Sequence, residues 1–209
     1  MKVSIGSKIF DGPWGGGNLF VKNLSLYLNS KNIEVIHDLY DKDIDIIILT
    51  DPRKSSYSST FTHEDIKNYL KYINGKALVI QRFNECDERK NTKDVNQIMI
   101  SANECSDKNI FVSRWLQNLY EEQGLSNKEN QTIMTGADVS VFNNHNSKIW
   151  DSKSPLKIVT HHWGTNANKG FQDYKILDKF IGQDNNNEKF EFTFTVSYTH
   201  LTLPTKRIV

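Results

Sequence analysis

The sequence predicts an α/β protein with a doubly wound, mostly parallel sheet: a Rossmann-like N-terminal domain followed by the start of a second Rossmann-like domain. Apolar runs with strand character alternate with segments that have one apolar helical face, and short connections separate them. This alternation is typical of such sheets. Residues 44–50 are almost continuously apolar, as expected for a parallel strand covered on both faces. Three consecutive glycines follow the first expected strand, where a ligand-binding turn lies in this fold.

The first half of the expected sheet contains three strands, at residues 3–7, 33–37 and 44–50. Between the first two strands, residues 19–28 carry apolar side chains at positions i, i+4, i+7 and i+8, which share one face of a helix. These side chains are Phe20, Leu24, Tyr27 and Leu28. We expect this face to pack on the sheet.

The next helix has a start signal and a stop signal. Thr62 is followed three positions later by Asp65, which is the pattern of a capping box, and the helix is expected to stop at Asn74 and Gly75. The side chains expected on its inner face are Ile66, Tyr69, Leu70 and Ile73.

The rest of the N-terminal domain repeats the same alternation. A helix is expected through Val95 and Ala102, and another is capped by Ser113 and ended by Gly124. The apolar residues of the last helix are Trp115, Leu116, Leu119 and Tyr120. The remaining strands are expected at residues 77–80, 110–112 and 132–134.

The chain is expected to divide into two domains and a tail. Residues 1–142 form the N-terminal domain, residues 143–155 a linker rich in Asn, Ser and Lys, and residues 156–195 part of a second domain. Two strands and one helix are too few for an independent core, so we expect the native protein to continue beyond residue 195. Residues 196–209 resemble the translation of sequencing-adapter DNA, and we expect them not to be native.

Charge and composition narrow the class of protein. The chain has 26 Lys and Arg against 25 Asp and Glu, a net charge of +1, which gives no field to attract nucleic acid or an anionic membrane surface. No signal peptide or membrane span is evident, so a cytoplasmic location is expected. Cys86 and Cys105 match no metal or redox spacing and are expected to be reduced, and no metal site is expected.

The glycine run is the strongest candidate for a binding site. Gly15, Gly16 and Gly17 leave a turn without Cβ atoms, so a ligand can approach the backbone closely. The first amides of the following helix have no partner inside it and carry partial positive charge. An anion such as phosphate is therefore expected there, with Asn18 beside it.

Three stretches resemble the family-4-type glycosyltransferases of the GT-B fold, which has two Rossmann-like domains. The first is the glycine-rich turn at residues 15–18, and the second is residues 110–116 followed by residues 133–142. In the second stretch Gly136, Asp138 and Phe142 fit the family's spacing, while Thr135 stands where Asn is usual. The third is the turn that ends in residues 168–171.

The resemblance implies a metal-independent enzyme of the hexosyltransferase type. It would move a sugar from a nucleotide-diphosphate donor to a hydroxyl group of a saccharide, lipid or other acceptor. The nucleotide sugar is a substrate rather than a cofactor. The resemblance also allows peripheral contact with a membrane. Gly15, Gly16, Gly17 and Asn18 would then bind the donor phosphates together with Lys169. The family's arginine before this lysine is replaced by Gly164, and its acidic ribose-binding stretch is missing.

Arg82 and Glu85 are the candidate catalytic residues. They stand at the expected carboxyl end of a strand, where they would orient the hydroxyl group of the acceptor. A histidine common at such a position in the family has no obvious counterpart here.

Two other functions stay open. A nucleotide-cofactor-dependent oxidoreductase also begins with strand, glycine turn and helix, and Asp38 stands where its ribose-binding acid would lie, but the third glycine of that motif would fall at Phe20. A non-catalytic nucleotide- or glycan-binding module is the second alternative. Because the donor pocket is expected to be incomplete, we predict no transferase turnover for the 209-residue chain by itself.

Overall fold

The computed structural model describes residues 1–12, 14–125, 128–162, 170–183 and 186–196. The chain divides into two compact units, Met1–Gly136 and Ala137–Val209. Each unit is described by itself below. Lys169 and residues 197–209 of the expected tail lie outside the described residues.

The first unit is built on a six-stranded sheet in which every neighbouring pair of strands is parallel. The order across the sheet is β2-β1-β3-β4-β5-β6. The strands are β1 (Lys2–Ile5), β2 (Glu34–Ile36), β3 (Ile46–Leu49), β4 (Leu78–Phe83), β5 (Lys108–Phe111) and β6 (Glu129–Thr132). The predicted α/β class and parallel sheet are confirmed.

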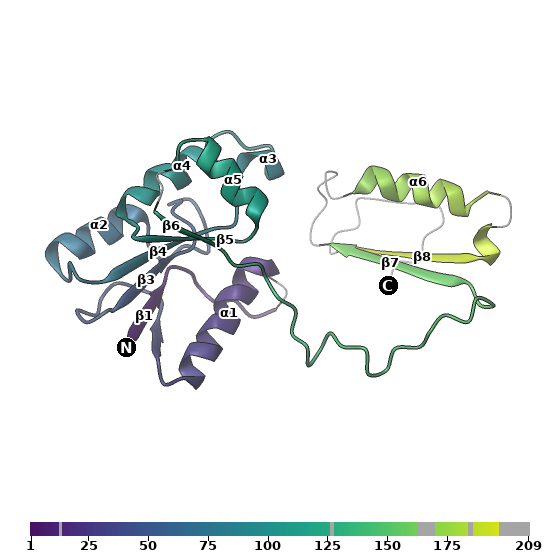
Figure 1. The fold of residues 1–209 in the computed structure, drawn as a ribbon, viewed down its shortest axis with the longest axis horizontal. Coiled ribbons are helices and arrows are strands. Elements are labelled where there is room, and N and C mark those ends of the chain that lie inside the picture. Colours follow the sequence, from purple (N-terminus) through teal and green to yellow (C-terminus); the bar gives the residue numbers. More distant parts are fainter. Residues whose placement is uncertain (13, 126–127, 163–169, 184–185, 197–209) are drawn as a thin grey trace. The chain divides into compact units, whose positions relative to one another are not determined.

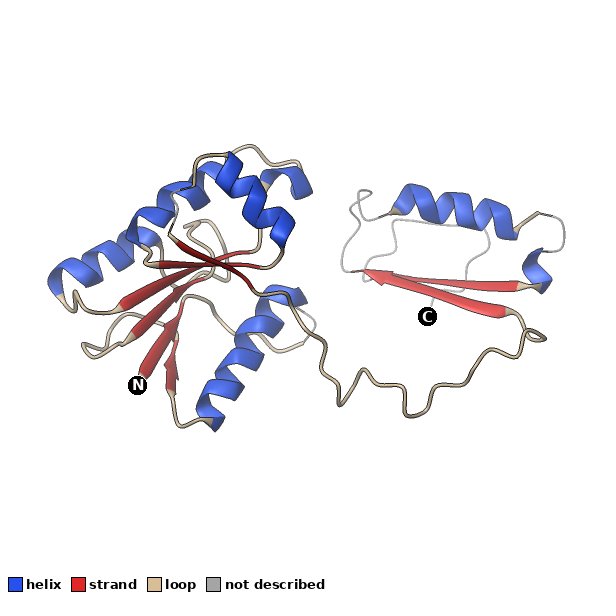
Figure 2. Ribbon diagram, viewed as in Figure 1, coloured by secondary structure: helices blue, strands red, loops and turns tan. Residues whose placement is uncertain are grey.

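Helices flank this sheet on both faces, with α1 on one and α2, α4 and α5 on the other (Figure 1; Figure 2). The helical segments are α1 (Gly15–Ser30), α2 (His63–Tyr72), α3 (Asp87–Lys90), α4 (Val95–Ala102), the 3₁₀ turn η1 (Asn103–Cys105) and α5 (Arg114–Glu122). Among the described residues, every helix is too short or too polar to cross a lipid bilayer.

The strand β3 shows why the sheet needs helices on both faces. Successive side chains of a strand point to opposite sides. Ile48 packs in the cluster that contains Val21 of α1, whereas Ile47 and Leu49 pack in the cluster that contains Ile66 of α2. The apolar run of residues 44–50 therefore buries both sides of one central strand, as predicted from its composition.

Several predicted details differ from the structure. Phe20, Leu24 and Leu28 of α1 pack against the core as predicted, but Tyr27 is 60% exposed. Trp115 of α5 is likewise exposed, while Leu116 and Tyr120 are buried. In each helix a bulky apolar side chain lies beside the stripe that faces the sheet, so periodicity alone included one residue too many.

Two predicted strands have different bounds. β4 continues to Phe83 rather than ending at residue 80, so Arg82 lies within the strand. β6 is Glu129–Thr132 instead of residues 132–134. Its polar side chains pair with the neighbouring strand, since Lys108 Nζ lies 2.6 Å from Glu129 Oε2 and Asn109 Nδ2 donates to Asn130 Oδ1 at 2.8 Å. A polar edge strand of this kind has no apolar pattern to reveal it.

In its described residues, the second unit contains one parallel pair of strands and one helix. β7 (Leu156–His162) pairs with β8 (Phe190–Val196), and α6 (Phe171–Ile181) packs near them, followed by the 3₁₀ turn η2 (Asn186–Glu188). Phe171, Ile181 and Phe192 form its small core.

Candidate functional site

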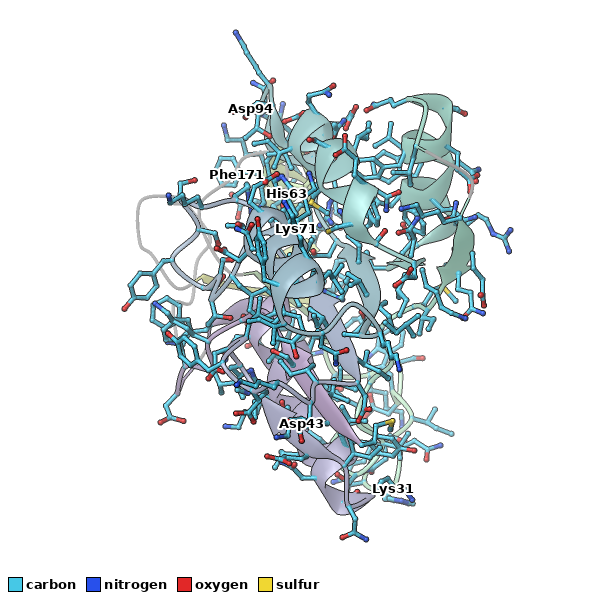
Figure 3. All side chains as sticks on the ribbon, turned by 90° about the vertical axis from the view of Figure 1, so that its left-hand side faces the viewer. Lys31, Asp43, His63, Lys71, Asp94 and Phe171 are labelled. Atoms are coloured by element: carbon cyan, nitrogen blue, oxygen red, sulfur yellow. The ribbon has the colours of Figure 1, made fainter. Side chains whose placement is uncertain are left out.

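The strand order places a topological switch point between β1 and β3. The chain leaves β1 through α1 toward β2 on one side, and continues from β3 toward β4, β5 and β6 on the other. Because the connections diverge there, a crevice forms beyond the carboxyl ends of these two strands. Figure 3 marks the two edges of the sheet, with His63 and Asp94 on the carboxyl side and Lys31 and Asp43 on the amino side.

A cavity of about 360 Å³ lies at this switch point. Its lining comes from four places in the chain: the loop after β1, the start of α1, the loop after β3, and the end of β4 with the segment that follows it. The lining residues are Ser7, Phe10, Trp14, Gly17, Asn18, Val21, Thr50, Asp51, Arg53, Ser56, Tyr57, Ser58, Arg82, Asn84, Glu85 and Lys90.

The start of α1 forms one wall of the cavity. The helix begins at Gly15 rather than at residue 19, so the three glycines are its first turn. Only Gly15, with φ +77°, has a backbone conformation that favours glycine. A Cβ atom at Gly16 or Gly17 would meet nothing within 4 Å, so neither glycine is required by packing. This open space lies over amides that have no partner inside the helix.

The side chain of Asn18 binds the preceding loop. Its Oδ1 accepts a hydrogen bond from the Phe10 backbone N–H at 2.8 Å, and its Nδ2 donates to the Phe10 carbonyl oxygen at 2.9 Å. Both ends of the amide are therefore occupied by one residue of the loop. Asn18 lines the cavity, and in this structure its side chain positions Phe10.

Arg82 is the buried cation of the cavity. The residue is only 6% exposed, and its guanidinium lies 3.9 Å from the centroid of the Phe20 ring. Burial lowers the pKa of Arg82 to about 10, and Glu85 opposes this shift through its charge. In the described part of the chain, no acceptor forms a hydrogen bond or ion pair with this guanidinium. A buried cation without a counter-ion is costly, so this position favours an anionic ligand.

The other charged groups of the cavity are already paired. Arg53 Nε and Nη2 donate to the two carboxylate oxygens of Asp51 at 2.8 and 2.7 Å. Burial raises the pKa of Asp51, but the hydrogen bonds and charge of Arg53 outweigh it, and the pKa is lowered. Lys90 Nζ lies 2.7 Å from Glu85 Oε2. These pairs leave Arg82 as the cation whose charge is not locally balanced within the described lining.

The backbone of Glu85 is fixed from the core. The hydroxyl of Tyr120 donates to the Glu85 carbonyl oxygen at 2.8 Å, and the Tyr120 ring packs against Phe83 and Phe111. Glu85 therefore has a fixed place at the cavity even though it lies in a loop. Its carboxylate and the Arg82 guanidinium line one cavity, which brings the two predicted catalytic residues together.

Three aromatic rings at the cavity were not predicted from the sequence. The ring centroids of Phe10 and Trp14 are 4.7 Å apart, those of Phe10 and Tyr57 are 5.2 Å apart, and those of Trp14 and Tyr57 are 6.4 Å apart. Phe10 and Trp14 precede the three glycines in the sequence, but Tyr57 comes from the loop after β3. No periodic pattern links residues so far apart in the chain.

The predicted binding residues thus divide into two groups. Gly17, Asn18, Arg82 and Glu85 line the cavity, with Gly15 and Gly16 in the adjoining first turn of α1. Lys169, the fifth predicted phosphate-binding residue, lies outside the described residues. Sequence reasoning missed Asp51 and Arg53, whose only signal was their position directly after a buried strand.

Comparisons with known proteins found no matching family model and no matching curated protein. Within the described residues, no group of three or more His, Cys, Asp or Glu side chains is arranged to hold a metal ion.

Proposed function

We propose that this chain carries the first Rossmann-like domain of a glycosyltransferase that uses a nucleotide-diphosphate sugar. The observation that carries the proposal is the cavity at the β1/β3 switch point. Its lining includes Gly17 of the first turn of α1 and the buried Arg82, which has no counter-ion among the described residues. Both features attract negative charge. A diphosphate is the part of a sugar donor that such a site would bind.

The reaction needs stabilisation of the charge that builds on the diphosphate as the glycosidic bond breaks. Fixed donors aimed at developing charge are the most effective means, and the loss of one such donor lowers the rate about 10²- to 10³-fold. The amides of Gly16 and Gly17 and the guanidinium of Arg82 supply such donors at the cavity. Lys169 would add a further cation, as the family resemblance implies.

Glu85 is the group proposed to orient the acceptor. An acceptor hydroxyl needs a hydrogen-bond acceptor close to the reacting carbon. The Glu85 carboxylate lines the same cavity as Arg82, and Tyr120 fixes its backbone. The same carboxylate forms an ion pair with Lys90, whose Nζ lies 2.7 Å from Oε2.

A nucleotide-cofactor oxidoreductase fits the cavity less well. Small-molecule sites span about 300–1,000 Å³, and the cavity of about 360 Å³ is at the low end of this range. Asp38, the acid that would bind its ribose, lines a different cavity together with Tyr40 and Tyr72. A phosphate-binding module without catalysis remains the second candidate, since the cavity lies entirely within the first unit.

The test is calorimetric titration of the 209-residue chain with inorganic pyrophosphate, UDP-glucose, GDP-mannose and NADH. We expect pyrophosphate and at least one nucleotide sugar to bind. Gly16→Val should abolish this binding, because the new side chain would cover the open amides. Gly136→Val is the matched control, since a Cβ there also meets nothing within 4 Å. Binding of NADH alone, or equal binding by the two variants, would refute the proposal.

A further inference from the structure

The three aromatic rings at the cavity are nearly parallel and stack on one another, with Trp14 and Tyr57 the more exposed. The interplanar angle is 34° for Phe10 and Trp14, 16° for Phe10 and Tyr57, and 26° for Trp14 and Tyr57. The three rings therefore face in similar directions. Trp14 is 52% exposed and Tyr57 is 71% exposed, although all three residues line the cavity. We call Phe10, Trp14 and Tyr57 the ring platform.

The ring platform is fixed by the chain around it. The side chain of Asn18 binds both backbone polar groups of Phe10. The Lys8 backbone N–H donates to the Ser58 carbonyl oxygen at 2.8 Å, which joins the loop that carries Phe10 to the loop that carries Tyr57. This bond between the two loops and the two bonds from Asn18 fix the backbone that carries Phe10.

The polar groups beside the platform are also fixed. The bidentate pair of Asp51 and Arg53 and the hydroxyls of Ser56 and Ser58 line the same cavity. Ser56 and Ser58 lie 3.2 Å apart, oxygen to oxygen. The cavity thus presents an apolar surface next to paired charges and hydroxyl groups.

From these features we propose that the ring platform binds a pyranose ring of a saccharide, and that this saccharide is the acceptor. The proposal rests on the proposed function. A sugar ring has one face of C–H groups, which the negative face of an aromatic ring attracts, and hydroxyl groups at its edge. Carboxylate, guanidinium and hydroxyl groups beside the rings match that edge. A lipid chain would need an apolar lining, whereas most lining residues here are polar.

The cavity also fits the proposal in size and charge. At about 360 Å³ it has room for a single ring and a phosphate group, at the low end of small-molecule sites. The pyranose would lie on the platform, and its hydroxyl group would point toward Glu85. The diphosphate would lie between Arg82 and the first turn of α1.

The experiment is saturation-transfer NMR and calorimetry on the 209-residue chain with methyl pyranosides and disaccharides. Uridine and isoprenyl phosphate are the competing probes, and pyrophosphate is titrated separately. We expect saccharides to bind, and Trp14→Ala and Tyr57→Ala to weaken that binding about five- to tenfold each. The affinity for pyrophosphate should change less than twofold.

The matched control is Tyr72→Ala. Tyr72 is 70% exposed and has the Lys71 ammonium 4.8 Å from its ring centroid, as Tyr57 has Lys8 at 5.2 Å. This variant should bind saccharides like the unchanged chain. Thermal unfolding of all three variants separates a lost contact from lost folding.

The outcomes separate this inference from the proposed function. Binding of pyrophosphate without any saccharide would overturn the ring-platform proposal and leave the phosphate site standing. Tyr57-dependent binding of uridine or isoprenyl phosphate in place of saccharides would also overturn it. Saccharide binding that depends on Trp14 and Tyr57, without pyrophosphate binding, would support the platform and refute the transferase.

Discussion

The helices α1 and α2 begin near the same edge of the sheet, but their first turns are completed differently. In α2, the Asp65 carboxylate accepts hydrogen bonds from the backbone N–H and the hydroxyl of Thr62, both at 2.8 Å, and Glu64 adds a second negative charge. In α1, Trp14 makes no side-chain hydrogen bond to the first turn, which consists of Gly15, Gly16 and Gly17. One helix start is satisfied by its own side chains, and the other is open.

This difference bears on where the proposed anion would bind. The partial positive charge of a helix start can be balanced by acidic side chains or by a bound anion. In α2 the acidic side chains Glu64 and Asp65 balance this charge. In α1 the first turn has no acidic side chain. Arg82 lies near α1, over the Phe20 ring, and adds a second uncompensated positive group. The comparison therefore supports the proposed anion site at α1, whereas α2 has a structural cap.

The largest effect is expected from Arg82→Met, which removes the buried cation and keeps much of the side-chain volume. Hydrogen bonds to charged groups are worth about 1.5–3 kcal/mol, so the affinity for inorganic pyrophosphate should fall about 10- to 100-fold. The free energy of unfolding should change little, because an uncompensated buried charge is lost at the same time. Calorimetry and urea unfolding measure the two quantities.

Arg114→Met is the control for this variant. Arg114 is exposed at the start of α5. This helix start is capped by the Ser113 side chain, which accepts a hydrogen bond from the Leu116 N–H. Its replacement should leave pyrophosphate affinity unchanged. If Arg82→Met binds pyrophosphate as tightly as the Arg114 variant does, the anion does not lie beside Arg82.

A pair of alanine substitutions separates the conformational role of the glycines from their role in binding. Gly15→Ala should lower the free energy of unfolding by about 1–2 kcal/mol, because φ +77° is unfavourable for alanine. Gly16→Ala should raise it by about 0.5–1 kcal/mol, since its site is open and glycine is a poor helix former. Urea unfolding measures both, and equal destabilisation would contradict the geometry described here.

The cap of α2 is tested with Asp65→Ala. Loss of the carboxylate leaves the Thr62 N–H without its partner and should cost about 1 kcal/mol of unfolding free energy. The affinity for pyrophosphate should not change, because this helix start is assigned no ligand. A fall in that affinity would show that the two helix starts are not separate in function.

The smallest effect is a pH dependence at Asp51. Its pKa is lowered in the folded chain, so its stabilising contribution is complete above the unfolded value of about 3.9 and is lost as the pH falls through the folded value. Asp51→Asn should therefore lower the free energy of unfolding at pH 7 by about 1 kcal/mol, which is seen as a lower melting temperature. The difference from the unchanged chain should begin to shrink as the pH falls below about 4 and disappear only below the lowered pKa of Asp51 in the folded chain. Calorimetric scans across this range check it.

The sequence was sufficient where local chemistry decides the structure. The Thr62 and Asp65 spacing indicated the start of α2, and the Ser113 cap indicated the start of α5, whose Leu116 N–H donates to Ser113 Oγ at 3.2 Å. In both helices a side chain accepts a hydrogen bond from a backbone N–H three residues away. The glycine run was likewise assigned to the carboxyl edge of the sheet, where the cavity lies.

The sequence was insufficient where distant segments meet. Tyr57 joins Phe10 and Trp14 only because the loops after β1 and β3 converge at the switch point. The strand β4 continues through Arg82 because its backbone pairs with β5, with Arg82 opposite Ile110. A buried arginine in a strand breaks the apolar pattern, so the predicted strand ended three residues too early. Arg82, which interrupts the apolar pattern of β4, is also the buried cation of the cavity.

The carboxamide of Asn18 has a consequence for how the two halves of the cavity respond to occupancy. This residue follows the three glycines directly and is bonded at both ends to the main chain of Phe10. A molecule that draws the beginning of the helix toward itself must also shift the aromatic surface. Binding at the first turn of α1 would therefore alter the ring platform. The side chain of Asn18 would then influence the order in which two reactants bind.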